Sequence, residues 1–544
     1  MTDRLDLPSR YRDQIEVLLR EHVPGVEVWA YGSRVTGESH DASDLDLVLR
    51  GPDLERIPSG QLADLNEALE ESNVPIIVQV HDWARLPESF HREIEQAYVV
   101  LVEEKELGRV SDGWVSLRLG DVCTKIGSGA TPRGGKEVYL EEGPYALIRS
   151  QNVYNNGFSY DGLAFINQQQ ATELKNVEVF ADDVLLNIIG DSVARVCQVA
   201  PDVLPARVNQ HVAIIRPDPN KLSPRFLRYF LVSPEIQATL LSWAGSGGTR
   251  NALTKGMIES FDVQAPMDVA EQHAIAHILG TLDDKIELNR RMNETLEEMA
   301  RALFKSWFVD FDPVRAKMEG RDPSLPKHLA DLFPDRLVDS ELGLIPEGWE
   351  VKALNYCADL NPESWSRINY PEGIEYVDLA NTKWGVIEAT QYYFWKDAPS
   401  RAKRVLRSGD TIVGTVRPGN GSYSFVGHEG LTGSTGFAVL RPIHPRYREF
   451  VYLSATSAEN IEHLAHRADG AAYPAVRPNV VGETRVITPG IDTDVLNFFS
   501  MIVAPIINKM ESNKIESRTL AALRDTLLPK LISGELRVDI GKRY

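Results

Sequence analysis

The segment EQHAIAHILGTLDDKIELNRRMNETLEEMARALFKSWF, Glu271 to Phe308, predicts one long helix. Side chains suited to a helix interface recur along it at alternating steps of four and three, the spacing of a coiled-coil seam. These positions are Leu282, Ile286, Asn289, Asn293, Leu296, Ala300, Leu303 and Trp307. A second stretch, NFFSMIVAPIINKMESNKIESRTLAALRDTLLPKLI from Asn497, has equivalent positions at Ile506, Met510, Asn513, Ser517, Leu520, Leu527 and Leu531. The two segments are therefore expected to pair with each other.

Asn289 and Asn513 occupy corresponding places in the two segments. A buried asparagine weakens a seam but penalises every register in which its amide lacks a partner, so these residues are expected to set the alignment. Pairing could be parallel or antiparallel, and the antiparallel form would separate whatever precedes each helix. About 35 helical residues would then span about 50 Å, close to 15 base pairs of DNA. A helical linker or a dimerisation stalk would show the same periodicity.

Each long helix follows one copy of a larger sequence repeat. GWVSLRLGDVC at Gly113 is echoed by GWEVKALNYC at Gly348, and DDVLLNIIGD by GDTIVGTVRPG near Asp410. HVAIIRP is echoed by GFAVLRP, and each pair is separated by about 225 to 235 residues. The sequence therefore predicts a duplicated unit, each copy β-rich and followed by a long helix.

Residues 113–534 resemble the specificity subunits of type I restriction-modification systems. The resemblance is carried by GTRNALTKGMIESFDVQAPMDVAEQ, WFVDFDPVRAKMEG, LFPDRLVDSELGLIPEGW and the ending LLPKLISGEL. It implies two α/β target-recognition domains, each reading half of a split DNA target, separated by an antiparallel coiled coil. It also implies docking of methyltransferase subunits and of a translocating restriction nuclease, with the outer faces of the helices as the methyltransferase surface.

The expected organisation is an α+β multidomain chain. Its parts are a nucleotidyltransferase-like domain at 1–107, recognition domain 1 at 113–267, long helix 1 at 268–310, a linker at 311–345, recognition domain 2 at 346–490 and long helix 2 at 491–535.

Base reading requires donors and acceptors on loops, and Arg and Lys also neutralise phosphates. Domain 1 offers the loops 127–136, 149–157 and 245–255, and domain 2 offers 401–407, 416–424 and 467–479. The predicted DNA contacts are Arg133, Lys136, Asn152, Asn155, Arg250, Lys255, Arg401, Arg417, Tyr423, Tyr473 and Arg477. The alternative is that these loops are solvated turns whose polarity needs no ligand.

The recognition half carries no catalytic motif of its own. GATPRGGKE departs from the phosphate-binding P-loop in spacing, and NPES at Asn361 lacks the NPP[YF] pattern of a methyltransferase. This half is therefore expected to need no cofactor, with S-adenosylmethionine and ATP used by the partner subunits that the resemblance implies.

The front of the chain predicts a compact α/β unit, with helices at 7–22, 62–71 and 87–98 and strands at 26–31, 45–49 and 74–80. Its stretch YGSRVTGESHDASDLDLVLRG resembles the minimal nucleotidyltransferases of the polymerase-β type. Gly32 and Ser33 open a turn that could hold a nucleotide. Asp44 and Asp46 share one face of a strand and could bind Mg²⁺.

The resemblance implies a third carboxylate on a later strand, where VQVHDW places Gln79 instead. His81 would share the face of Gln79, and Asp82 would point the other way. Three interpretations stay open: catalytic transfer with Mg²⁺ and a nucleoside triphosphate, nucleotide binding or partner docking without turnover, and a structural remnant.

Composition and charge are compatible with each of these interpretations and do not choose between them. The net charge of the 544 residues is −20, but residues 1–107 hold 10 Lys and Arg against 23 Asp and Glu, which leaves −7 for the remainder. Basic clusters there could still bind phosphates. Cys123, Cys197 and Cys357 lack metal or disulfide spacing and are expected to be buried thiols. With no signal peptide or apolar span in view, a cytoplasmic protein without membrane contact is expected.

Two hypotheses follow. The chain is a DNA-specificity subunit, noncatalytic by itself, with a degenerate domain at its front; or it is a nucleotidyltransferase that the repeat region targets to its substrate.

Overall fold

The protein is described from a computed structural model of the chain. Its described residues are 5–23, 26–37, 39–40, 43–51, 54, 56–70, 72, 74–102, 113–245, 251–470, 473–489 and 494–538. They form two compact units, Met1–Ser116 and Leu117–Tyr544, and each is treated by itself.

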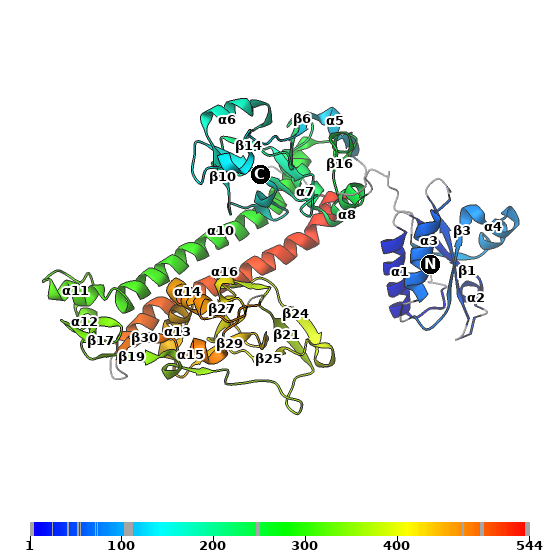
Figure 1. Cartoon of the computed structure of the whole chain (residues 1–544). Coiled ribbons are helices and arrows are strands. Elements are labelled where there is room, and N and C mark those ends of the chain that lie inside the picture. The colour runs from blue at the N-terminus through cyan, green and yellow to red at the C-terminus, as the bar shows by residue number, and fades with distance from the viewer. Residues whose placement is uncertain are drawn as a thin grey trace. The chain divides into compact units, whose positions relative to one another are not determined.

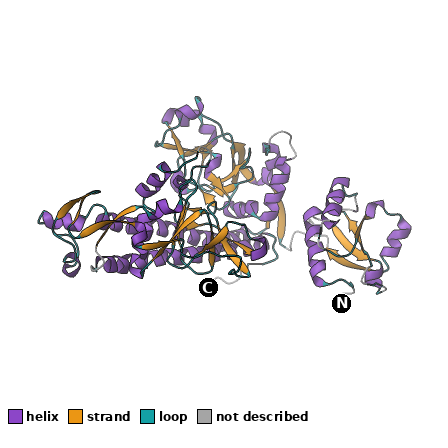
Figure 2. Cartoon of the chain, turned by 60° about the horizontal axis from the view of Figure 1, so that its bottom comes forward, coloured by secondary structure: helices purple, strands orange, loops and turns teal. Residues whose placement is uncertain are grey.

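The N-terminal unit is a four-stranded sheet of order β3-β2-β1-β4, which lies between helices (Figure 2). Its elements are α1 (Ser9–His22), β1 (Glu27–Tyr31), α2 (Ser33–Thr36), β2 (Leu45–Arg50), α3 (Ser59–Glu70), β3 (Val78–Asp82), α4 (Glu88–Ile94) and β4 (Tyr98–Val102). One apolar cluster includes Ile15 and Leu19 of α1 with Leu65 of α3, and a second includes Trp29, Val48 and Trp83. The predicted helix at 87–98 is wrong at its end, because the apolar run that starts at Tyr98 pairs with β1 instead.

The two recognition domains have the same strand order. Domain 1 contains sheets β13-β12-β15-β6 and β10-β7-β14-β11, and domain 2 contains β27-β26-β29-β20 and β24-β21-β28-β25. In each second sheet one pair is parallel, β7 with β14 and β21 with β28. The duplication in the sequence therefore extends to identical β topology.

The strands of domain 1 are β5 (Trp114–Arg118), β6 (Cys123–Ser128), β7 (Tyr145–Ile148), β8 (Val153–Tyr154), β9 (Gly157–Phe158), β10 (Ala164–Ile166), β11 (Glu178–Val179), β12 (Val184–Asn187), β13 (Val196–Gln198), β14 (Ala206–Val208), β15 (Val212–Pro217) and β16 (Asp262–Pro266), and its main helices are α7 (Pro224–Val232), α8 (Pro234–Gly245) and α9 (Lys255–Glu259).

Those of domain 2 are β19 (Trp349–Ala353), β20 (Ala358–Leu360), β21 (Gly373–Val377), β22 (Thr382–Lys383), β23 (Val386–Ile387), β24 (Gln391–Phe394), β25 (Ala402–Val405), β26 (Thr411–Gly414), β27 (Tyr423–Phe425), β28 (Leu431–Ser434), β29 (Phe437–Pro442) and β30 (Arg485–Pro489), with α13 (Arg448–Ala455), α14 (Ala458–His466) and α15 (Pro478–Gly482).

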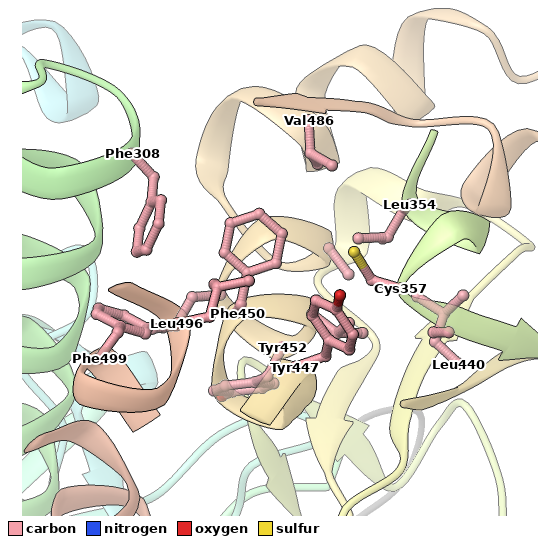
Figure 3. Packing of buried hydrophobic residues seen from close by; sticks show 14 of the residues in the cluster. Phe308, Leu354, Cys357, Leu440, Tyr447, Phe450, Tyr452, Val486, Leu496 and Phe499 are labelled. Carbon is pink, nitrogen blue, oxygen red and sulfur yellow. The ribbon is translucent and has the colours of Figure 1, made fainter. Parts of the chain in front are cut away.

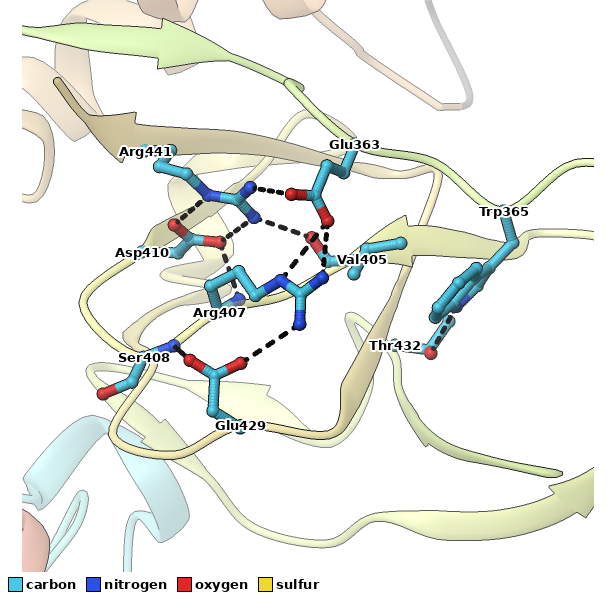
Figure 4. A network of polar contacts seen from close by, with 9 residues as sticks. All are labelled: Glu363, Trp365, Val405, Arg407, Ser408, Asp410, Glu429, Thr432 and Arg441. Atoms are coloured by element: carbon cyan, nitrogen blue, oxygen red, sulfur yellow. Dashed lines mark hydrogen bonds and ion pairs between the residues drawn. The ribbon is translucent and has the colours of Figure 1, made fainter. Parts of the chain in front are cut away.

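Two of the repeated sequence motifs form the same buried ion pair in both domains. The Arg216 guanidinium donates to both oxygens of Asp183 at 2.6 and 2.7 Å, and Arg441 donates to both oxygens of Asp410 at 2.9 Å (Figure 4). Both aspartates are 1% exposed or less. A bidentate pair of this kind fixes the relative position of neighbouring strands, so the echo between the motifs reflects the fold.

The long helices α10 (Val269–Phe308) and α16 (Val495–Ile532) lie side by side and antiparallel (Figure 1). Near the start of α10, Asp283 contacts Arg524, and further along Asn293 donates to the Met510 carbonyl. The residue numbers of the contacts on α16 fall as those on α10 rise, which shows that the two helices run antiparallel. Domain 1 precedes α10 and domain 2 precedes α16, so the two domains are attached near opposite ends of the helix pair.

Domain 2 is joined to the helices by a large aromatic cluster (Figure 3). Phe308 of α10 lies 5.1 Å from Phe450 of α13 and 4.9 Å from Phe499 of α16, measured between ring centroids. The same core contains Trp349 and Leu496. Burial of this many aromatic rings holds domain 2 to both helices at once.

The connection between the halves consists of short elements: α11 (Asp312–Met318), α12 (Lys327–Ala330), β17 (Leu337–Ser340) and β18 (Gly343–Pro346). Phe311 and Phe333 from this stretch are buried in the aromatic cluster. Within the described part of the chain, no helix has the length and apolar character needed to cross a bilayer.

Candidate functional site

In each recognition domain, part of one predicted contact loop meets the loop that follows β12 or β26, at the same place in the topology. The loop after β26 was itself a predicted contact loop, whereas the loop after β12 was not predicted to contact DNA. In domain 1 the loop after β12 is bridged at Ile189 to Ala252, and Gly190 donates its backbone N–H to the Asn251 carbonyl. In domain 2 the loop after β26 is bridged at Val416 to Ala475, and Arg417 donates to the Pro474 carbonyl at 2.7 Å. Segments about 60 residues apart in sequence thus form one surface in each copy.

Two predicted residues meet on this surface in domain 2, and a third follows them in the sequence. The Arg417 guanidinium carbon lies 4.9 Å from the centroid of the Tyr473 ring, and the Tyr473 side chain is 73% exposed. Arg417 has φ 48°, a left-handed conformation that costs a non-glycine residue free energy. Arg477, four residues after Tyr473, is also exposed. The arrangement presents a cation and an aromatic ring together, which suits contact with phosphates and base edges.

Residues that the sequence prediction missed lie beside these loops, and they include the exposed Trp384 and the partly buried Arg195. Trp384, 58% exposed, connects β22 and β23, and its backbone N–H donates to the Gly421 carbonyl at 2.7 Å. In domain 1, Arg195 lies 4.6 Å above the ring of Tyr154. The signal for Trp384 is the dipeptide Trp384-Gly385, because a large aromatic residue at a tight turn between two short strands has little core to enter.

The other predicted contacts in domain 1 differ in whether their side chains are free at the surface or also bonded to other parts of the domain. Arg133, Lys136 and Lys255 are exposed, the last with an ion pair to Glu259 at 3.2 Å. Asn155 is exposed, but its amide accepts from the Val196 N–H and donates to Gln237, so it also holds the loop in place. Arg250 lies outside the described residues.

Two predictions are wrong because the side chains are interior. Asn152 is fully buried, and its amide donates to the carbonyls of Ser159 and Asp161 within its own loop. Tyr423 is 6% exposed, and its hydroxyl accepts from Arg301 of α10 at 3.4 Å. Both residues support the fold and neither is available to a ligand.

The basic cluster 401–407 is only partly available. Arg401 is exposed, whereas the Arg407 guanidinium is paired with Glu363 at 3.0 Å and with Glu429 at 3.5 Å (Figure 4). Because these carboxylates neutralise Arg407, the run of positive charge in the sequence overstates the charge on the surface.

Asn289 and Asn513 are brought together at the centre of the helix pair, where they are 1% and 0% exposed. The Asn289 amide donates to Glu516 at 2.9 Å and to Ser517 at 3.3 Å, and Asn513 donates to Asn293 at 2.8 Å. Any slip of one helix along the other would leave these buried amides without partners, at a cost typical of unsatisfied polar groups.

The N-terminal unit brings its predicted residues to one edge of the sheet. Gly32 has φ 79°, and a Cβ added there would lie 2.5 Å from an oxygen of Asp46, so only glycine lets the carboxylate approach this turn. Ser33 begins α2, a helix of only four residues. Burial raises the pKa of Asp46, and the Asp44 charge adds to the rise while His81 opposes it.

The third position is occupied as the sequence predicts. Gln79 pairs with Asp46 across the parallel strands β2 and β3, and its amide donates to Asp44 at 2.8 Å. Asp82 is 5% exposed on the other face and accepts from the Ile57 N–H and from Arg85. The described residues therefore supply two of the three carboxylates expected for nucleotidyl transfer with Mg²⁺, and they do not fit the full set.

Comparison with known proteins assigns both parts of the chain. Residues 111–298 match the family "Type I restriction modification DNA specificity domain", and residues 12–107 match "Nucleotidyltransferase domain". The chain is 27% identical to the type I restriction enzyme HindI specificity subunit of Haemophilus influenzae, over 78% of this chain and 99% of the relative.

Its front is 39% identical to the probable protein adenylyltransferase MntA of the same organism, over 19% of this chain and 88% of that protein. The type I S subunit structure from M. genitalium aligns with 78% of this chain and 97% of its own, at 16% identity and a TM-score of 0.47. The chain therefore belongs to the specificity subunits of type I restriction-modification systems, and residues 12–107 are a nucleotidyltransferase-family domain.

Proposed function

We propose that this chain reads a split DNA target, with one half-site contacted by each recognition domain and the gap between them set by the paired helices. The observation that carries the proposal is the loop junction that recurs in both domains, at Ile189–Ala252 and at Val416–Ala475, on units attached near opposite ends of an antiparallel helix pair. Two similar heads on one rod suit two half-sites on one duplex.

Exposed side chains on the loops of both domains suit duplex DNA. Arg417 and Arg477 of domain 2, and Arg133 and Lys136 of domain 1, are exposed cations that can contact phosphates or guanine edges. Tyr473 and Trp384 offer exposed rings for contact with sugars or bases. The net charge of −20 does not oppose this assignment, because the acidic excess is concentrated in residues 1–107.

The partners that the family implies are a methyltransferase subunit, which would use S-adenosylmethionine, and a restriction subunit, which would use ATP. In this proposal the methyltransferase packs on the outward side of α16. Met501, Ile515 and Leu523 are 69%, 51% and 46% exposed there, with the uncharged Ser512 and Thr519 between them. An exposed helix face this poor in charge is typical of a protein contact. The complex would act in the cytoplasm, where it meets DNA.

The docking surface can be tested by substitution. Ile515→Lys with Leu523→Lys is expected to abolish co-purification with the methyltransferase subunit, because two charges would be buried without partners. The matched control is Leu342→Lys, at a residue 49% exposed in the connection between the halves. Retention of the methyltransferase by the double variant would move the surface elsewhere.

Adenylyl transfer, the activity in the name of the MntA relative, is the second candidate function. It is not favoured, because Gln79 stands in the place of an acid and is already bonded to Asp44.

The experiment for the proposed function is a genome-wide map of methylated adenine in cells carrying this chain and its methyltransferase. The expected result is modification at one motif made of two specific halves separated by unspecified bases, lost when this chain is deleted. An active methyltransferase that modifies a continuous motif, or the same motif without this chain, would contradict the proposal.

A further inference from the structure

The carboxylate pair of the N-terminal unit already has a neutral partner at the position of the missing acid. Asp44 and Asp46 lie two residues apart at β2, and Gln79 is directly opposite Asp46 on β3. The Gln79 amide donates its N–H to an Asp44 oxygen at 2.8 Å. A cation bound between these carboxylates would draw on the Asp44 Oδ2 that accepts from Gln79, so amide and metal compete for this oxygen.

Neighbouring acids do not replace the missing charge. Asp82 is the one carboxylate on β3, and its oxygens are engaged by Ala84, Ile57 and Arg85 on the opposite face. In the described part of the chain, no three side chains among His, Cys, Asp and Glu are grouped so as to hold a metal ion. His81, on the face of Gln79, is positioned to oppose the charge of Asp46 but brings no negative charge.

We infer that this domain keeps its two carboxylates in a cation-independent arrangement, held by Gln79, and that it does not transfer nucleotidyl groups. A two-cation centre needs carboxylates to neutralise two ions that lie about 3.5 to 4 Å apart. An amide can offer one neutral oxygen to one ion, and it contributes no charge to neutralise that ion. Replacing Gln79 with a carboxylate removes the competing N–H and adds a charge, which should create the cation site. The inference concerns residues 12–107 and does not depend on the proposed DNA function.

The test is a titration of the full chain with Mn²⁺, in which the electron paramagnetic resonance signal of free Mn²⁺ measures binding. Gln79→Asp is expected to bind Mn²⁺ at least about tenfold more tightly than the wild type, and the gain should vanish in Gln79→Asp/Asp46→Asn. Gln96→Asp, which adds the same charge at an exposed position after α4, controls for general attraction of cations and should match the wild type.

Thermal unfolding gives a second readout on the same proteins, because a cation that binds only the folded state raises its stability. Mg²⁺ should raise the Tm of the N-terminal transition in Gln79→Asp and leave the wild type unchanged. If the Gln79→Asp variant does not fold because its side chain is shorter, Gln79→Glu takes its place in both measurements. Wild-type binding as tight as that of Gln79→Asp and lost in Asp46→Asn would overturn the inference, and so would the absence of any gain in both acidic variants.

Discussion

The two recognition domains share their strand order but are fastened to the helix pair by different chemistry. Domain 1 is held by a charged centre, where the Asp283 carboxylate of α10 accepts from Arg228 and Tyr229 of α7 and from Arg524 of α16. Domain 2 is held by aromatic rings around Phe308. The sheets are thus the same in the two copies while the attachments differ, so the first attachment should respond to charge and pH and the second to loss of apolar volume.

The largest effect is expected at the aromatic attachment. Phe308→Ala removes a ring that is 3% exposed and contacts Phe304, Trp349, Phe450 and Phe499. The free energy of unfolding should fall by about 4 kcal/mol, the usual cost of a large cavity. Urea unfolding measures this. Phe394→Ala, at a residue 53% exposed, is the control and should change stability by less than about 0.5 kcal/mol.

A somewhat smaller loss is expected at the charged attachment. Asp283→Ala leaves Arg228, which is 7% exposed, without its carboxylate and should cost about 3 kcal/mol. Hydrogen exchange should quicken in α7 and remain unchanged in α13. Asp284→Ala is the control, since that carboxylate is two-thirds exposed and pairs with Arg225 at the surface. Equal exchange changes in both domains would mean that the attachments are not independent.

The same attachment should be sensitive to acid. Burial by itself raises the pKa of Asp283, but Arg228, Arg524 and Tyr229 outweigh it and hold the pKa below the ordinary 3.8. A carboxyl with a lowered pKa in the folded state stabilises it above the unfolded pKa, and this contribution is lost as the pH falls through the folded value. The stability difference between the wild type and Asp283→Asn should therefore be constant near neutrality and shrink below about pH 4. A difference that grows on acidification would reverse the assignment.

The shared part of the two domains should give matched effects. Asp183→Asn and Asp410→Asn each weaken a buried pair with an arginine, Arg216 and Arg441, and each should lower stability by about 2 kcal/mol. Calorimetry on the two single variants checks whether the losses agree. A loss confined to one domain would show that the repeated motif has different roles in the two copies.

The smallest effect is expected at the polar centre between the helices. Asn289→Ala removes the donors to Glu516 and Ser517 and should cost about 1 kcal/mol. Thr295→Ala, on an exposed side of α10, is the control. Unchanged stability in Asn289→Ala would mean that apolar contacts alone set the register.

The sequence predicted those features that depend on local period and on repetition. The seam spacing identified both long helices, and the motif echoes identified two copies of one fold. The pairing of β7 with β14, about 60 residues apart, left no local pattern. The end of α4 was missed because the apolar run from Tyr98 fits a helix as well as a strand. Pairing with β1 makes it a strand.

The sequence predicted which loops lie at the candidate site better than it predicted which residues on them are exposed. Arg417 and Tyr473 meet on the surface, but Asn152 and Tyr423 are interior although their residue types are common in both places. An amide or a phenol can satisfy a buried backbone group as readily as a DNA base, and the choice is made by tertiary contacts that a single sequence does not contain.

The most direct test of the central claim is to map methylated adenine for the wild type and for a variant altered in one domain only. Arg417→Ala/Tyr473→Ala removes the exposed pair of domain 2 and leaves domain 1 and the helices intact. One half of the split motif is expected to become relaxed or lost, while the other half and the spacing between the halves stay unchanged. A variant whose whole motif changes, or whose motif is identical to that of the wild type, would contradict the assignment of one half-site to each domain.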